Sequence, residues 1–174
     1  MLPLAPPLAA NTLILDNSSS TIEVAIKTTI GNFISKFDTF TPQLYLDPSL
    51  GKVTGSVHFL LAELKSNNDE RDMEIYTWLK TDKFPKADFV LDKVTTDFKT
   101  GASEAQGRLT IQNVERIVNF SLSVAIKNKV ITIEGSSDLD TRDYGLPIYR
   151  KFYFFSAEPK VRVHFRLIGS VSSQ

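Results

Sequence analysis

The sequence contains no cysteine, only two histidines and no long hydrophobic run. Without cysteine the chain cannot form disulfides, thiol nucleophiles or zinc–thiolate sites. The longest apolar runs have the length of a strand, so no transmembrane helix is predicted. The charges balance, with Lys+Arg 20 against Asp+Glu 20 and no basic block, which makes nucleic acid a poor candidate for a partner.

Recognisable catalytic motifs are absent as well. By strand parity His58 and His164 point away from the apolar face, and no carboxylate–histidine pair occurs at metal-ligand spacing. Gly101, Gly107 and Gly135 form no phosphate-binding loop, and no serine lies in a nucleophile elbow. We therefore predict a protein that is not an enzyme and needs no cofactor, with an enzyme for a hydrophobic substrate as a less favoured alternative.

The chain has 174 residues, of which 42% are hydrophobic, enough for one domain with a substantial core. The first ten residues differ from the rest, because they include three prolines and no charge. They lack the charged start and apolar centre of an intact signal peptide. We predict that residues 1–12 are a flexible arm or the remnant of an export signal, and that a single domain spans 13–174.

One segment, residues 67–80, has the pattern of a helix. Asn68 and Asp69 can accept hydrogen bonds from the free N–H groups of its first turn. Ile75, Trp78 and Leu79 form one short apolar stripe, and the proline that follows at position 85 requires an extended exit. A single amphipathic helix among strands predicts a barrel or curled sheet that is stoppered at one end, with Trp78 against the opening.

Most of the remaining chain alternates between apolar and polar residues with a period of two, as half-buried strands do. The apolar positions fall within 13–15, 22–26, 33–46, 53–61, 89–91, 107–111, 118–126, 131–133 and 161–167. The alternation slips beyond Thr39 and Phe40, which predicts a bulge or bend, and turns are expected at 47–51 and 100–101. About eight antiparallel strands can close into a barrel whose interior either packs solid or holds a small ligand.

The predicted interior is rich in phenylalanine, of which the chain contains twelve. These rings could pack as a solid core, or they could line an apolar cavity, since ligand pockets are lined mainly by hydrophobic and aromatic side chains. Periodicity does not separate the two. Two Arg-Asp doublets, Arg71-Asp72 and Arg142-Asp143, are predicted to form ion pairs and caps, or else a clamp for a ligand headgroup.

The segment 147–155 is a second aromatic feature, because five of the seven residues from Tyr149 onward are aromatic. Successive side chains of a strand point to opposite faces, so some of these rings must leave the interior. The segment could pack as a plain arm on the outer wall. We favour a contact site, either a homodimer interface or a loop that caps the cavity and meets a membrane during ligand transfer.

Four segments together resemble the YceI-like family. Residues 68–89 resemble its Arg-Asp, Phe and Tyr-Pro segment, and residues 107–114 (GRLTIQNV) resemble its G-x-L-T-I-x-G-V strand turn. Residues 141–146 (TRDYGL) resemble its N-R-x-D/E-F-G-L signature, and residues 16–33 fall in family order. The resemblance spans 13–167. Three departures are serine around Ser19 where the family often has histidine, Asn113 in place of the turn glycine, and an unusually aromatic segment after Leu146.

The resemblance implies an all-β fold, an eight-stranded antiparallel lipocalin-like barrel with one short helix and a long apolar cavity. It also implies binding of an isoprenoid, an isoprenoid quinone or a fatty-acid-like ligand, in the bacterial periplasm or secreted space. A solid-cored barrel that acts through its surface, as an interaction or stress-response protein, is the alternative. If the cavity exists, we expect interior apolar side chains to bind the ligand. These are Val24, Ile26, Phe33, Phe37, Val57, Phe59, Trp78, Phe89, Leu109, Phe120, Leu122, Ile131 and Phe165.

Overall fold

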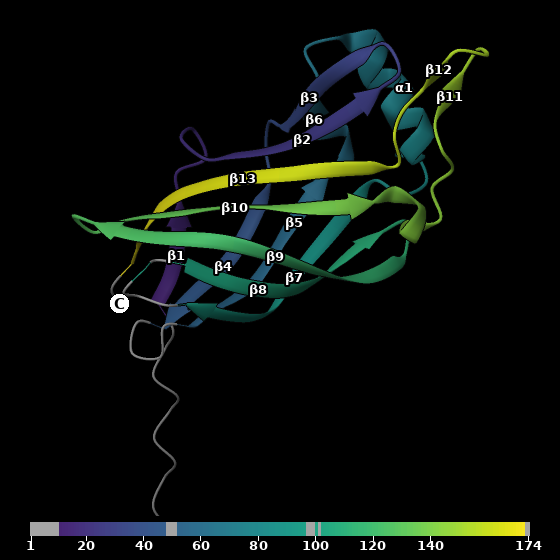
Figure 1. Ribbon diagram of the computed structural model, residues 1–174. Coiled ribbons are helices and arrows are strands. Elements are labelled where there is room, and N and C mark those ends of the chain that lie inside the picture. Colours follow the sequence, from purple (N-terminus) through teal and green to yellow (C-terminus); the bar gives the residue numbers. More distant parts are fainter. Residues whose placement is uncertain (1–10, 48–51, 97–99, 101, 173–174) are drawn as a thin grey trace, which may run out of the picture.

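The computed structural model describes residues 11–47, 52–96, 100 and 102–172, which form a curled antiparallel sheet with an α-helix at one end (Figure 1). The sheet closes into a barrel because β1 pairs with β4 on one side and with β13 on the other. In ring order the eight strands are β1 (Asn11–Leu15), β4 (Thr41–Asp47), β5 (Lys52–Leu60), β7 (Lys86–Thr96), β8 (Ala102–Ile111), β9 (Val114–Lys127), β10 (Val130–Asp140) and β13 (Lys160–Val171). The predicted eight-stranded antiparallel barrel with one helix is confirmed.

Three further strands lengthen the barrel at the helix end. They are β2 (Thr21–Thr28), β3 (Gly31–Phe37) and β6 (Leu64–Lys65). β2 follows β1 along the same edge of β13, and β3 pairs with β2 and β6. Between β1 and β2 the Asp16 carboxylate accepts hydrogen bonds from the hydroxyls of Ser18 and Ser19, at 2.6 and 2.8 Å, and this turn interrupts the strand. The predicted bend near Thr39 and Phe40 is also confirmed, because it separates β3 from β4.

Some predicted boundaries differ from the structure. β1 begins at Asn11, two residues before the predicted start of the domain, because Asn11 and Thr12 pair with β4. Residues 1–10, and with them the predicted export-signal remnant, lie outside the described residues. So do residues 48–51 of one predicted turn and residue 101 of another.

Two strand connections are tight hairpin turns with left-handed backbone. Gln112 and Asn113, between β8 and β9, have φ of 50° and 62°, and Asn128 and Lys129, between β9 and β10, have φ of 51° and 65°. Two consecutive residues with positive φ are typical of type I′ hairpins, in which asparagine is favoured. Asn113 therefore keeps the turn, as predicted. The β9–β10 hairpin runs past the end of β8, and this leaves Ile126 exposed although it was expected on the inner face.

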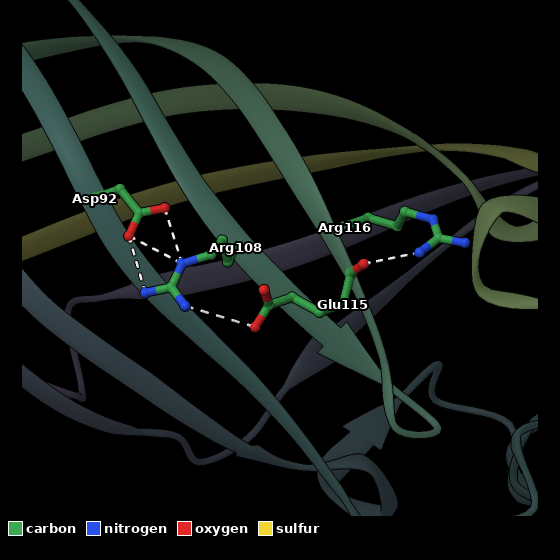
Figure 2. Close-up of polar contacts among 4 residues, drawn as sticks. All are labelled: Asp92, Arg108, Glu115 and Arg116. Carbon is green, nitrogen blue, oxygen red and sulfur yellow. Dashed lines mark hydrogen bonds and ion pairs between the residues drawn. The ribbon is translucent and has the colours of Figure 1, made fainter.

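The outer wall carries opposite charges on neighbouring strands. Figure 2 shows Arg108 of β8 placed between Asp92 of β7 and Glu115 of β9, with nitrogen–oxygen distances of 3.0 and 3.6 Å. Arg116 donates to the backbone carbonyl of Glu115 at 2.9 Å (Figure 2). Exposed pairs of this kind contribute little stability each. These charges help to fix the register of the strands, because a slip of one residue in the pairing would turn them toward the apolar interior.

The interior holds two groups of buried apolar side chains. The barrel cluster lies between the strands of the barrel, with Leu13, Leu46 and Ile131 at the end opposite the helix. It comprises Leu13, Ile22, Phe40, Leu44, Leu46, Val53, Val57, Ala105, Leu122, Ile131, Ile133 and Leu167. The lid cluster lies at the helix end and comprises Leu61, Leu79, Ala87, Tyr144 and Leu146. Burial raises the pKa of Tyr144 to about 12, so this side chain stays uncharged near neutral pH.

The helix α1 (Asp69–Leu79) packs beside a 3₁₀ turn, η1 (Leu61–Glu63), at the end of β5. Asn68 caps the helix, because its side chain accepts from the backbone N–H of Arg71 at 2.9 Å. Buried Asp72 accepts from the N–H and hydroxyl of Ser66, at 2.8 and 2.6 Å, which ties the first turn to the preceding strand. The helix ends at Lys80, whose backbone is left-handed. No helix among the described residues is long and apolar enough to cross a membrane.

A second 3₁₀ turn and a small hairpin complete the helix end. η2 (Thr141–Tyr144) follows β10, and β11 (Arg150–Lys151) pairs with β12 (Phe155–Ser156). Together with the residues between and beside them, these two strands form what we call the aromatic arm, residues 147–157. In Figure 1 the arm rises beside α1, at the same end of the barrel as the turn between β2 and β3.

Candidate functional site

The barrel holds an apolar cavity of about 650 Å³ that is lined from the helix end as far as Val53 on β5 and Val94 on β7, close to the opposite end of these strands. Its volume falls within the range of roughly 300–1,000 Å³ that is usual for small-molecule sites. Strands contribute most of its wall, and α1 and the aromatic arm contribute its rim. This open space favours a cavity over a solid core, the choice that periodicity left open.

The residues predicted to bind a ligand are brought together at this cavity. All of them line it except Ile131, whose side chain is buried at 4% exposure away from the cavity. Ile131 lies on β10 opposite Gly169, near the end of the barrel opposite the helix. The alternation correctly indicated that Ile131 faces inward, but the depth of a side chain along the barrel axis does not follow from alternation.

Two aromatic groups shape the cavity wall. Phe120 lies between Phe89 and Phe165, with ring centroids 5.8 and 5.7 Å away. On the other side Phe37 and Phe59 have centroids 4.8 Å apart. Offset and edge-to-face contacts of this kind stabilise aromatic pairs. They also hold the rings in place around the central space.

Glycines in the wall give two of these rings room to lie against it. A Cβ atom at Gly107 would overlap the Phe89 ring and lie 2.7 Å from the carbonyl oxygen of Val90. A Cβ atom at Gly135 would lie 2.8 Å from the Phe165 ring. Side chains at these positions would push the rings toward the lumen, so the absence of a side chain keeps the cavity open.

We expect Gly107→Ala to lower the free energy of unfolding by about 1–3 kcal/mol, because the methyl group overpacks the wall, and to reduce ligand uptake. Denaturant titration and ligand titration measure the two effects. The matched control is the same change in a Phe89→Leu background, where the smaller side chain should reduce the cost. An equal cost in both backgrounds would show that the Phe89 ring is not what Gly107 accommodates.

The rim of the cavity joins α1 to the aromatic arm. The indole Nε1 of Trp78 donates to the carbonyl oxygen of Pro147 at 2.8 Å, and the Tyr149 hydroxyl donates to Glu74 at 3.1 Å. Lys151 forms an ion pair with Glu74. The structure therefore places Trp78 against the mouth of the barrel, and it shows that the helix and the arm are held together by polar contacts around the opening.

The other side of the arm is bound to the β2–β3 turn. The Thr29 hydroxyl donates to the carbonyl oxygen of Phe154 at 2.9 Å, and the Thr29 N–H donates to that of Ser156 at 3.1 Å. Thr28 and Ala157 form an isolated antiparallel bridge. Since both of its sides are held, the arm spans the rim as a fixed element.

The two Arg-Asp doublets do not form ion pairs within themselves. Arg142 pairs with Asp140 at 2.6 Å, and this contact holds the pKa of Asp140 at about 2. Arg71 lies over the Phe33 ring at 4.2 Å, where a cation–π contact is favourable. No carboxylate among the described residues lies within ion-pair distance of Arg71, which lines the cavity. The doublet at Arg142 is structural, whereas Arg71 faces the site.

The contact between Glu74 and Lys151 depends on pH. The hydrogen bond from Lys151, supported by the weaker one from the Tyr149 hydroxyl, holds the pKa of Glu74 below its ordinary value of 4.5. In return, the hydrogen bond to Glu74 raises the pKa of Lys151. A lowered carboxyl pKa means that the link is complete above pH 4.5 and is lost as the pH falls through the lower, folded-state value. Glu70 also faces Lys151 and is the other carboxylate that acts on it.

We expect acidification to release the arm from α1, because protonated Glu74 no longer attracts Lys151. The emission of Trp78, the single tryptophan, should report this as a step with its midpoint below pH 4.5. Glu74→Gln should abolish the step and Glu70→Gln should retain it. An unchanged step in Glu74→Gln would assign the transition to another group.

A serine, a histidine and an aspartate lie in a row on the outer wall, which sequence reasoning missed. Ser56 Oγ is 3.3 Å from His58 Nε2, and His58 Nδ1 is 2.6 Å from Asp88 Oδ1. Ser56 and His58 are two residues apart on β5, and Asp88 pairs with His58 from β7, so pairing the two predicted strands could have found it. The backbone here is engaged in strand pairing, which leaves no donor in this described part of the sheet for an oxyanion.

The sequence model of the YceI-like domain family matches residues 14–168 of this chain. The chain belongs to the YceI-like family. No curated protein matches it by sequence. Among solved structures, Burkholderia cenocepacia BcnA superposes with a TM-score of 0.78 at 16% identity, over 89% of this chain and 99% of that one. The Campylobacter jejuni YceI protein superposes with a TM-score of 0.66 at 14% identity, over 80% and 85%.

These comparisons establish the fold of this YceI-like chain and its relatives. Identities this low carry the architecture and not the ligand. Membership of the family is consistent with binding of a hydrophobic ligand, and the family is generally one of binding proteins.

Proposed function

We propose that this YceI-like protein binds or transports a long-chain apolar or amphiphilic molecule, such as an isoprenoid, an isoprenoid quinone or a fatty acid, without chemical conversion. The observation that carries the proposal is the apolar cavity of about 650 Å³ with a polar rim. A chain buried along such a wall gains about 0.8 kcal/mol for each CH₂ group removed from water. The polar end of the ligand would stay at the rim, close to water.

The rim carries charges of both signs, because Glu70, Glu74 and Glu158 line the cavity beside Arg71 and Lys151. Lys151 is already paired with Glu74, whereas Arg71 faces the cavity mouth with only the Phe33 ring as a described partner for its charge. A guanidinium can donate two parallel hydrogen bonds to a carboxylate or phosphate. Arg71 therefore supports an amphiphile with an anionic headgroup over a wholly neutral one.

Native mass spectrometry of protein purified without detergent tests the proposed function. We expect a bound apolar mass, or uptake of added oleic acid or a polyprenol at one molecule per chain. Protein that stays free of ligand and takes up neither compound would contradict the proposal. That result would favour a role for the outer surface instead.

The headgroup preference has its own prediction. Arg71→Gln should weaken the binding of oleate by about tenfold, which corresponds to the loss of a hydrogen bond to a charged group. Its affinity for oleyl alcohol, which has the same chain and no charge, should stay unchanged. Calorimetric titration with both ligands measures the difference, and an equal loss for both would mean that Arg71 only shapes the rim.

A further inference from the structure

The end of the aromatic arm exposes three consecutive aromatic side chains. Phe152 and Phe154 are 72% exposed, and Tyr153 is fully exposed. The rings of Phe152 and Phe154 stack with a centroid distance of 6.0 Å and an angle of 16°. We call residues 152–154 the tip. Ile30, in the β2–β3 turn to which the arm is bonded, is 73% exposed as well.

The tip is not explained by folding. Phe152 has φ of 58°, a left-handed conformation that is uncommon for a bulky residue and costs of order 1–3 kcal/mol. Its ring gains little burial in return, because it is mostly exposed. Glycine or asparagine would fit this position of the turn better. A strained and exposed aromatic side chain therefore points to a contact outside the chain.

The tip also adjoins the opening of the cavity. Phe152 and Phe154 belong to its rim, together with Tyr149 and Lys151 of the same arm. The contacts of Thr29 on one side and Glu74 on the other hold the arm in this position. A surface that the tip enters would therefore face the mouth through which a ligand passes.

We propose that the tip inserts into the interface of a lipid bilayer and presents the cavity mouth to the membrane. Phenylalanine and tyrosine beside the cationic side chain of Arg150 match the composition of membrane-interface anchors. A second protein copy fits less well. Three aromatic side chains of about 200 Å² each fall short of the roughly 800 Å² per partner that stable dimers bury. The inference rests on the proposed function, since it supplies the route for a water-insoluble ligand.

The test uses the full chain and unilamellar phosphatidylcholine vesicles, with and without an anionic lipid, in a flotation assay. Tyr153→Ser is the informative variant, because Tyr153 is at the tip and does not line the cavity. Loss of one inserted aromatic side chain should lower vesicle partitioning by about tenfold. Ile117→Ser, which removes an apolar side chain that is 64% exposed on β9, is the matched control and should partition as the original protein does.

Uptake of a fluorescent polyene fatty acid separates this inference from the proposed function. Tyr153→Ser should bind the probe in vesicle-free solution with unchanged affinity and acquire it more slowly from loaded vesicles. Equal partitioning of Tyr153→Ser and the original protein would overturn the inference and leave the cavity function intact. The tip would instead be a subunit interface if the original protein does not bind vesicles and light scattering shows a dimer that Tyr153→Ser dissociates.

Discussion

Val163→Trp is expected to weaken binding of a long-chain ligand by about a hundredfold while the barrel stays folded. Val163 lies on β13 opposite Val24 of β2, and both side chains line the cavity. An indole at this position would take the space of three or four ligand carbons, and at about 0.8 kcal/mol for each the loss is about 3 kcal/mol. Calorimetric titration with oleate measures the affinity, and thermal unfolding measures the stability.

The stability of this variant separates a cavity from a packed core. Inserting atoms into a full core costs about 1–3 kcal/mol, whereas an indole that enters empty space should leave the melting temperature unchanged or raise it. His164→Trp is the control, because the adjacent side chain points outward next to Glu134 and carries the same bulk away from the lumen. Strong destabilisation by Val163→Trp with unaltered ligand affinity would contradict the cavity.

Asp72→Ala is expected to produce the largest loss of stability at the helix end. The Asp72 side chain is buried at 4% exposure and accepts two hydrogen bonds from Ser66, which is itself buried. Removing the carboxylate leaves the Ser66 N–H and hydroxyl without these partners, at a cost of about 3 kcal/mol. For a chain of this size that corresponds to a fall in Tm of roughly 10 °C.

The loss should be concentrated in α1 and the rim. Because the barrel strands do not depend on Asp72, the emission of Trp78 should change at lower denaturant than the far-ultraviolet signal of the sheet does. Asp69→Ala is the matched control, since Asp69 lies exposed in the same first turn, and it should cost only a few tenths of a kcal/mol. Equal effects of the two changes would show that the hydrogen bonds between Asp72 and Ser66 add no stability of their own.

Several features of this protein follow from local sequence alone. The alternation of Val118, Phe120 and Leu122 assigns their inner face, because successive side chains of a strand point to opposite sides. The caps and the apolar stripe of 67–80 predict a helix, which the structure places at Asp69–Leu79. The slip in parity near Phe40 predicts the break between β3 and β4. Each of these depends on neighbours a few residues away along the chain.

Other features were decided by contacts between distant strands. Whether the interior phenylalanines fill the barrel or line it depends on which residue lies beneath each ring, and the position of Gly107 under Phe89 comes from the register of β7 and β8. The row of Ser56, His58 and Asp88, and the position of Arg71 over the Phe33 ring, likewise follow from pairing and packing. Periodicity determines which face a side chain takes. Only the closed sheet determines which side chains meet across the lumen, and with them the volume that remains open.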